Sequence, residues 1–221
     1  MAIGEYLVAV CDVLGFSHLV RTNPLETVYE NYLGLRRQVR SFQCMVGYKP
    51  RSEPLLIVDG AVFSDTVLLW APAEGAMDVL PMLLCFLVGQ SIGSMPLRVG
   101  VAFGKCVIDS QNDIFIGQPI IDAHQTETRQ QWVGGAYHHS CQTLPGFTEW
   151  LCDHRAAVKY PVPAKEGDPL EYALDWTWAA EGDVLATLRR QEQDAPRDKD
   201  KEKWQRARTF CEIRFRSADA T

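Results

Sequence analysis

The sequence lacks several features that would assign it quickly to a common class. No Cys-x-x-Cys pair occurs among its 7 cysteines, which argues against zinc-knuckle and dithiol redox motifs. The longest apolar segment, VLPMLLCFLVGQSIG (residues 79–93), is shorter than the roughly 20 apolar residues of a membrane span. No signal-peptide pattern opens the chain. We therefore expect a cytoplasmic protein without a membrane partner, whose cysteines act as small hydrophobic residues in a reducing compartment.

Basic residues are also scarce. The chain has 22 Lys and Arg residues against 28 Asp and Glu residues, a formal net charge of -6. This balance argues against a nucleic-acid partner, which requires a basic surface. A small phosphorylated ligand remains compatible, because bound metal ions neutralise phosphates locally. With 221 residues, 47% of them hydrophobic, the chain is long enough for one domain over residues 1–221 with a substantial core.

The first 130 residues alternate between strand and helix patterns. The apolar run at 5–12 predicts a strand buried on both faces, and the spacing of apolar residues over 24–46 predicts a helix. The remaining predictions are two strands within 55–70 with a turn at Asp59-Gly60 or Ser64-Asp65, a helix over 74–92, two strands within 97–109 with a turn at Gly104-Lys105, and a helix over 118–130. This order predicts an α+β fold with a ferredoxin-like split βαβ (βαββαβ) core over about residues 5–130.

The pattern is weaker in the C-terminal α/β elaboration, about residues 131–221. AAVKYPVPA (156–164) predicts a strand that ends at prolines. QEQDAPRDKDKEKWQRAR (191–208) is highly charged, which is typical of a solvated helix or linker. TFCEIRFR (209–216) is predicted as a final strand.

An aspartate ends the first predicted strand, in YLVAVCDVLGF (residues 6–16). In a split βαβ sheet this strand lies next to the hairpin, so Asp12 and Asp65 can meet. Two adjacent carboxylates repel each other unless they share a proton or a cation, and oxygen ligands suit Mg²⁺ or Mn²⁺. Alternatively, Asp12 is a turn former or helix cap and Asp65 is a turn residue. The spacing alone leaves both readings open.

Four motifs in order resemble those of class III nucleotidyl cyclases. They are CDVLGFSHLV, FSDTVLLW, LRVGVAFGKCVI and FIGQPIIDAHQTE, and they cover residues 5–130. The matching residues are Asp12 with Gly15-Phe16, Asp65, Arg98-Gly100-Gly104 and Gly117-Ala123-Glu127. The resemblance implies the cyclase catalytic-domain fold and binding of a nucleoside triphosphate.

The sequence departs from the purine cyclases at three positions. Ala61 stands where those enzymes have a base-reading lysine, and Ile121 and Gln125 stand where they have asparagine and arginine. The chain is more similar to the stand-alone pyrimidine cyclases of the Pycsar antiphage system, whose cyclic UMP or cyclic CMP activates a separate effector protein.

This resemblance implies an enzyme that converts UTP to cyclic UMP and pyrophosphate, with CTP as the alternative substrate. Two Mn²⁺ or Mg²⁺ ions would be held by Asp12, Asp65 and the backbone carbonyl of Val13. The family also implies a homodimer with its sites between the two subunits. The competing hypotheses are a catalytically degenerate nucleotide-binding or interaction module of the same fold, and a purine cyclase with unusual base contacts.

Five further positions complete the expected site. Gly15 permits close approach of the triphosphate, and Phe16 is either a sugar contact or a hydrophobic staple. Ala61 and Ile114 are expected near the base. Arg129 is the candidate cation for the transition state, with a surface role as the alternative.

Overall fold

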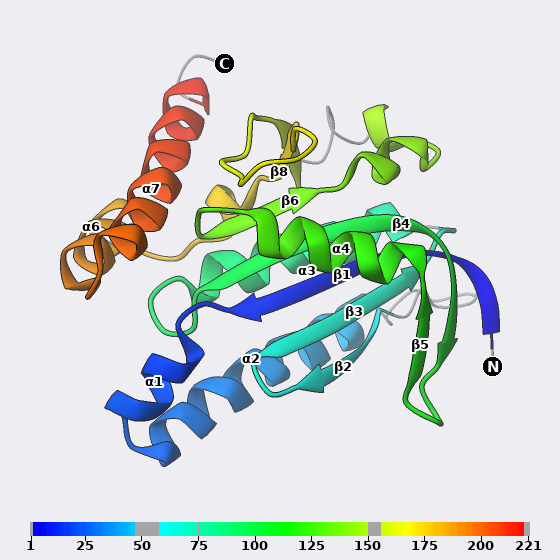
Figure 1. The fold of residues 1–221 in the computed structure, drawn as a ribbon, viewed down its shortest axis with the longest axis horizontal. Helices are drawn as coiled ribbons and strands as arrows, with labels where there is room; N and C mark the ends of the chain where they lie inside the picture. The colour runs from blue at the N-terminus through cyan, green and yellow to red at the C-terminus, as the bar shows by residue number, and fades with distance from the viewer. Residues whose placement is uncertain (1, 47–57, 75, 150–155, 219–221) are drawn as a thin grey trace.

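The computed structural model describes residues 2–46, 58–74, 76–149 and 156–218. Its centre is an eight-stranded sheet with strand order β2-β3-β1-β4-β6-β8-β7, and β5 pairs with β4 alone (Figure 1). The strands are β1 (Ala2–Val13), β2 (Asp59–Phe63), β3 (Thr66–Pro72), β4 (Leu97–Asp109), β5 (Ile114–Gly117), β6 (Gly134–Tyr137), β7 (Ala157–Lys159) and β8 (Tyr172–Leu174).

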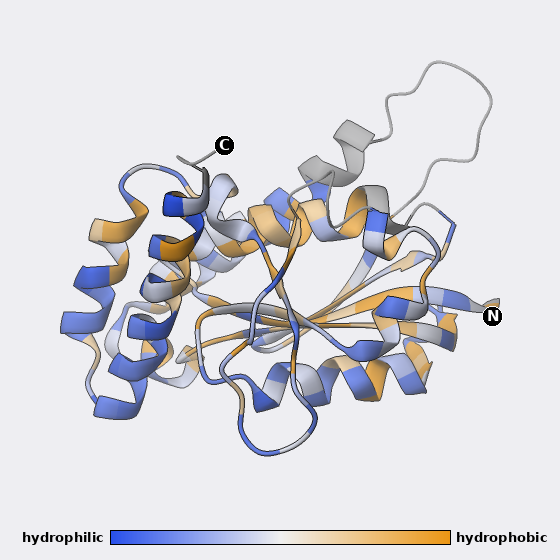
Figure 2. Ribbon diagram, turned by 90° about the horizontal axis from the view of Figure 1, so that it is seen from above, coloured by the Kyte–Doolittle hydropathy of each residue, from blue (hydrophilic) through white to orange (hydrophobic). Residues whose placement is uncertain are grey.

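Helices cover both faces of this sheet (Figure 2). The α-helices are α1 (Phe16–Thr22), α2 (Leu25–Val46), α3 (Ala76–Ser91), α4 (Gln118–Arg129), α6 (Val184–Asp194) and α7 (Asp198–Ala218), and the 3-10 helices are η1 (His139–Thr143) and η2 (Trp176–Ala179). Helices α2 and α3 pack on one face and α4 packs on the other. None of the described helices is both long enough and apolar enough to cross a bilayer.

The central strand β1 is buried on both faces, as the apolar run predicted. Leu7, Ala9 and Cys11 belong to the main core with α3, while Val8 and Val10 belong to the smaller core beneath α4. Successive side chains of a strand point to opposite faces, so a strand covered on both sides carries no polar alternation.

The hairpin beside β1 turns at Ser64-Asp65, one of the two predicted turns. Ser64 has a positive φ of 56°, and Asp59-Gly60, the other predicted turn, lies inside β2. The strands pair antiparallel in the order β2-β3-β1-β4, which confirms the α+β, split βαβ prediction.

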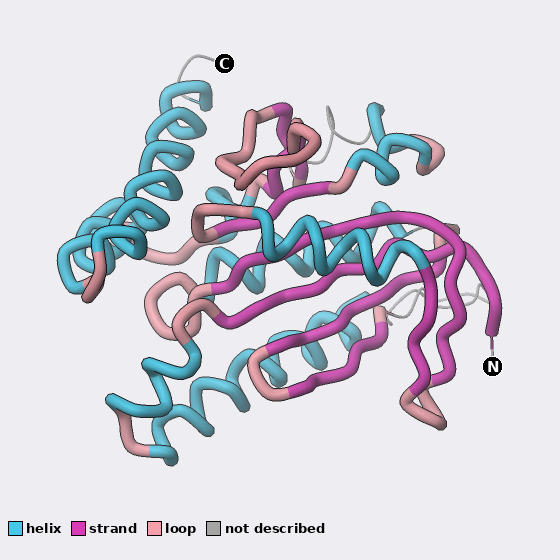
Figure 3. Tube along the Cα trace, viewed as in Figure 1, coloured by secondary structure: helices cyan, strands magenta, loops and turns pink. Residues whose placement is uncertain are grey.

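The predicted turn at Gly104-Lys105 is wrong. Residues Leu97–Asp109 form one strand of 13 residues (Figure 3). Gly104 adopts a φ of 154°, which lets the strand bend without leaving its ladder with β1. The chain turns after Asp109 instead, and β5 pairs back onto the end of β4.

The predicted strand at 209–216 is also wrong, because this segment belongs to α7. The buried residues of this helix recur at helical spacing: Trp204, Ala207, Phe210 and Cys211. Elsewhere in the C-terminal elaboration the sheet continues through β6, parallel to β4, and then β8 and β7. Strand β7 confirms the strand predicted in 156–164.

Candidate functional site

Asp12 and Asp65 lie side by side at one end of the central strands. The register of β1 and β3 pairs Asp12 with Thr66, the residue after Asp65. The amide of Val13 donates a hydrogen bond to the carbonyl of Asp65 at 2.9 Å. The hairpin turn is therefore fastened to the end of β1, and the topology that was read from the sequence brings the two carboxylates together.

Both carboxylates line a cleft of about 1030 Å³. Val13, Gly15 and Phe16 line the same cleft. Gly15 has a positive φ of 74° and caps α1, and no atom lies within 4 Å of the position that a Cβ would occupy there. Phe16 packs against Tyr32, with ring centroids 6.2 Å apart, as a partly buried residue at the edge of the core.

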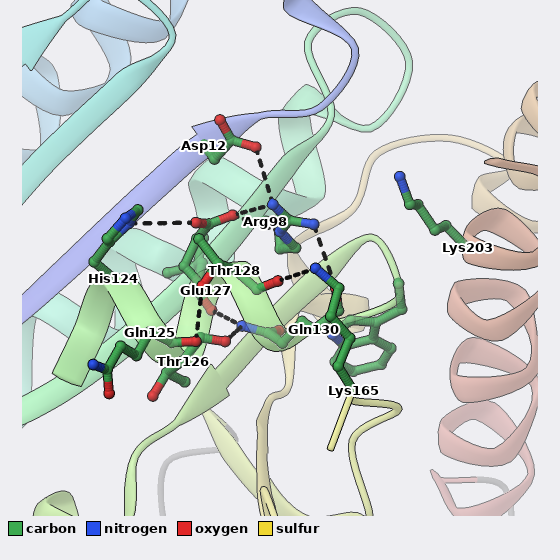
Figure 4. A network of polar contacts seen from close by, with 12 residues as sticks. Asp12, Arg98, His124, Gln125, Thr126, Glu127, Thr128, Gln130, Lys165 and Lys203 are labelled. Carbon is green, nitrogen blue, oxygen red and sulfur yellow. Dashed lines mark hydrogen bonds and ion pairs between the residues drawn. The ribbon is translucent and has the colours of Figure 1, made fainter. Parts of the chain in front are cut away.

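Arg98 joins Asp12 to α4 (Figure 4). It is the cross-strand partner of Asp12 on β4, and its guanidinium lies 3.4 Å from the Asp12 carboxylate. The same guanidinium donates to the carboxylate of Glu127, which is 2% exposed. Gly100 makes this contact possible: a Cβ there would lie 2.1 Å from the carbonyl of Ala123, so only glycine lets α4 pack this close.

The two acidic partners of Arg98 hold their protons more tightly than usual. Burial raises the pKa of Asp12, Arg98 opposes that shift, and Asp65 adds to it. Burial likewise raises the pKa of Glu127 to about 7, although Arg98 acts in the opposite direction. The neighbouring Asp12 and Asp65 carboxylates therefore repel each other at the cleft, a repulsion that a bound cation would relieve.

The donor set suits a hard divalent cation. Within the described residues, no group of three or more His, Cys, Asp and Glu side chains is arranged to hold a metal ion. The side-chain donors here are thus the two carboxylates of Asp12 and Asp65. Mg²⁺ is commonly held by one or two carboxylates, with water and substrate phosphates completing its shell, and carboxylate and water oxygens also suit Mn²⁺.

Ala61 lies at a second cavity of about 590 Å³, separate from the cleft. This cavity is partly aromatic: Phe115 lies 5.0 Å from Trp70 and 6.4 Å from Phe63, measured between ring centroids. Ile114 adjoins it in β5 and is 44% exposed. The residues expected at the base are thus grouped together, but not with the carboxylate pair.

Arg129 does not line the cleft. Its guanidinium donates to the carbonyl of Asp168, and the amine of Lys165 donates to the carbonyl of Thr128 at 2.9 Å. These contacts fasten the loop after β7 to the C-terminal end of α4, where cations are favoured. Neither cationic side chain lines the cleft.

Sequence reasoning missed a group of charged residues at the start of α7. Arg197, Asp200 and Lys203 line the same cleft as the carboxylate pair. A charged run gives no local sign of which face is solvated. The helical spacing of the apolar residues from Trp204 onward was the available signal, because it places Lys203 next to the buried face.

Known proteins resemble this chain in structure alone. No family model and no curated protein sequence matches it. A bacterial light-regulated adenylyl cyclase matches 85% of this chain and 96% of its own, with a TM-score of 0.52 and 11% identity. An adenylate cyclase from Trypanosoma brucei matches 81% and 93%, with a TM-score of 0.54 and 15% identity.

The dimeric guanylyl cyclase domain of the RhoGC fusion protein from the aquatic fungus Blastocladiella emersonii is similar in the same way. It matches 79% of this chain and 96% of its own, with a TM-score of 0.53 and 12% identity. The likeness defines the fold: the chain has the α+β catalytic-domain fold of class III nucleotidyl cyclases.

Proposed function

We propose that the chain is a class III nucleotidyl cyclase that converts UTP to 3′,5′-cyclic UMP and pyrophosphate. The observation that carries the proposal is the pair Asp12 and Asp65, held together at the wall of a cleft of about 1030 Å³ in a cyclase fold. In this reaction the ribose 3′-oxygen bonds to the α-phosphorus and the bond to pyrophosphate breaks. The proton of the 3′-hydroxyl passes to solvent.

The cleft residues have separate roles in this proposal. Asp12, Asp65 and the carbonyl of Val13 would hold two Mn²⁺ or Mg²⁺ ions. When bound, the ions supply charge neutralisation at the attacking and leaving oxygens. Gly15 leaves the backbone open to the triphosphate, since it has no side chain and nothing crowds it. Phe16 borders the same space and excludes water from one side of the sugar.

Pyrimidine selection is supported by what replaces the purine-reading residues. Ala61 stands in place of the base-reading lysine, and Ile121 and Gln125 stand in place of the asparagine and the arginine. Ala61 lies beside the aromatic side chains of Phe63 and Phe115. Stacking of a base on such a ring stabilises binding by about 1–3 kcal/mol. CTP is the alternative substrate, because uracil and cytosine differ by a donor/acceptor exchange at one ring position.

A homodimer would complete the site. The carboxylate pair and Ala61 line separate cavities of one chain, which suits a nucleotide bound between two copies. Exposed apolar side chains occur on the strands at the base side and on the neighbouring helix α4: Val62, Phe63, Ile114, Ile116 and Ile121. The B. emersonii domain is described as dimeric. In such a dimer Arg129 would act at the partner's site, and the cyclic product would signal to a separate effector in antiphage defence.

One observation favours a second candidate, a degenerate module of the same fold. Arg98 already balances part of the charge on Asp12, and Arg129 is engaged by Asp168. In a protein that no longer binds metal, such internal contacts would compensate the charges of Asp12 and Arg129.

Purified protein incubated with each of the four nucleoside triphosphates and Mn²⁺ separates these candidates. We expect cyclic UMP and pyrophosphate from UTP, and at least a 100-fold loss in Asp12→Asn and Asp65→Asn. Asp198→Asn, which alters a 98% exposed carboxylate, is the matched control and should keep full activity. Product from ATP or GTP alone would contradict pyrimidine selection. The absence of any cyclic product would favour the degenerate module.

A further inference from the structure

The C-terminal helices form the second wall of the cleft. Residues from the end of α6 and the start of α7 line it opposite the carboxylate pair, and in Figure 1 these helices pack at the end of the sheet where β1 leads into α1. The lining residues of this wall that bear on the argument are Asp194, Arg197, Asp200, Lys203 and Trp204. Helix α7 is anchored in the core of the same chain by Trp204, Ala207 and Phe210, so this wall is a fixed part of the fold.

One carboxylate holds two cations at this wall. Asp200 accepts from the guanidinium of Arg197 at 2.6 Å and from the amine of Lys203 at 3.1 Å. The side chains of Asp200 and Lys203 are 15% and 27% exposed, so the pair is partly enclosed, while Arg197 extends into solvent at 63%. These three residues together carry one net positive charge, which Asp194 on the same wall balances.

Lys203 extends from α7 toward the side of the cleft that holds Asp12 (Figure 4). The charged lining of the cleft comprises four acids, Asp12, Asp65, Asp194 and Asp200, and three cations, Arg21, Arg197 and Lys203. The net charge of this lining is -1, and removal of the two C-terminal cations would make it -3. A lining with a net charge of -1 repels a polyanion far less than a lining with a net charge of -3.

We propose that Lys203 and Arg197 bind the terminal phosphates of the nucleotide whose α-phosphate lies at Asp12 and Asp65. The inference rests on the proposed function. It assigns phosphate contacts to a helix outside the four cyclase-like motifs. The chemistry recognised is a polyphosphate chain, which both a nucleoside triphosphate and the pyrophosphate product supply. Cationic side chains suit this task because each phosphate oxygen accepts charge-assisted hydrogen bonds.

Inorganic tripolyphosphate is the probe, titrated calorimetrically into the full chain in Mn²⁺. Lys203→Gln and Arg197→Gln should each weaken binding about tenfold, and Lys203→Arg should restore most of it. Lys201→Gln is the matched control, because Lys201 lies on the same helix, pairs with Asp198 and does not line the cleft. It should change binding less than twofold. Melting curves of each variant confirm that the fold is retained.

The result that overturns the inference is unchanged tripolyphosphate binding in both Lys203→Gln and Arg197→Gln, or no binding by the unmodified chain. Failure of the proposed function is distinguishable from this. If no triphosphate is cyclised but tripolyphosphate binding still depends on Lys203, the polyphosphate site stands and the cyclase proposal falls. If cyclisation occurs, Lys203→Gln should raise the KM for UTP about tenfold, with Lys201→Gln unchanged.

Discussion

The guanidinium of Arg98 lies 3.4 Å from the carboxylate of Asp12, directly across the β1–β4 ladder. The same cation bonds to Glu127 on α4, so one arginine serves a cleft residue and a buried helix residue. The position of Asp12 in the cleft is thereby linked to the packing of α4. A substitution that removes the charge of Asp12 or of Glu127 should therefore change the energetics of the other residue.

Arg98→Met should lower the free energy of unfolding by about 2–4 kcal/mol at pH 7. The substitution leaves the partly buried Asp12 and the buried Glu127 without their shared cation. Urea unfolding followed by circular dichroism gives the value. In a Glu127→Gln background the same substitution should cost at least about 1 kcal/mol less, because one of the stranded charges is gone. An equal cost in both backgrounds would show that the contact is not energetically coupled.

Glu127 should make stability depend on pH in a specific direction. Its pKa is raised from 4.5 to about 7 by burial, so the folded state holds the proton more tightly than the unfolded state. This contribution to stability is fully present below about pH 4.5 and is lost as the pH rises through about 7. Between pH 4.5 and pH 8 the free energy of unfolding of Glu127→Gln should therefore rise, relative to that of the unmodified chain, by on the order of 2–3 kcal/mol.

Urea unfolding of the unmodified chain and of Glu127→Gln over this range of pH tests the sign. If the unmodified chain instead becomes more stable than Glu127→Gln as the pH rises, the ion pair with Arg98 lowers the pKa of Glu127 more than burial raises it.

Mn²⁺ should stabilise the chain through Asp12 and Asp65. A cation at 100 times its dissociation constant adds about 2.7 kcal/mol to the free energy of unfolding, or roughly 5–10 °C in Tm for a chain of this size. Differential scanning fluorimetry with and without Mn²⁺ measures this shift. Asp65→Asn should abolish it, yet leave the metal-free Tm unchanged or higher, because Asp65 repels Asp12. If Mn²⁺ raises the Tm of Asp12→Asn and of Asp65→Asn as much as that of the unmodified chain, the two carboxylates are not Mn²⁺ ligands.

Gly100→Ala should severely destabilise the fold. Its Cβ would lie 2.1 Å from the Ala123 carbonyl and 2.4 Å from the Glu127 amide, and neither backbone group can move without displacing α4. We expect a loss of more than about 3 kcal/mol in urea unfolding. Gly34→Ala is the control in α2: nothing lies within 4 Å of its Cβ, so a gain of about 0.5–1 kcal/mol is expected. Similar effects at both positions would contradict the close packing of α4.

The exposed apolar surface on the base side should mediate self-association. Ile116→Lys and Ile121→Lys place charge on side chains that are 63% and 51% exposed in the single chain. Sedimentation velocity should show the unmodified chain as a dimer and both variants as monomers without cyclase activity. Ile213→Lys, at a 44% exposed position on α7, is the matched control and should remain dimeric. A monomeric unmodified chain with full activity would exclude an intersubunit site.

Sequence patterns predicted the elements whose signal is local and repeated. The apolar run of β1 and the helical spacing of α2 were sufficient, and the split βαβ order then placed Asp12 next to Asp65. Gly104 was misleading because the φ that suits a turn also permits a bend inside a strand. The strand predicted at 209–216 was wrong because Phe210 and Cys211 continue a helical face that begins at Trp204.

The function of the charged run at 191–208 was not predictable from the sequence, since it depends on tertiary placement. Nothing local distinguishes Lys203, which lines the cleft, from Lys201, which does not. Glu127 was recognised only as part of a motif. Its burial follows from the missing side chain at Gly100, 27 positions earlier, a relationship that no periodicity reveals.

The wall formed by α6 and α7 has a consequence for biosynthesis. Both aspartates have been synthesised by position 65, whereas Lys203 follows 138 residues later. Until then, the growing chain holds both aspartates and Arg21 but lacks the cations of the α7 wall, Arg197 and Lys203. A premature stop after α4 would yield a polypeptide with every cyclase-like motif and only half a pocket.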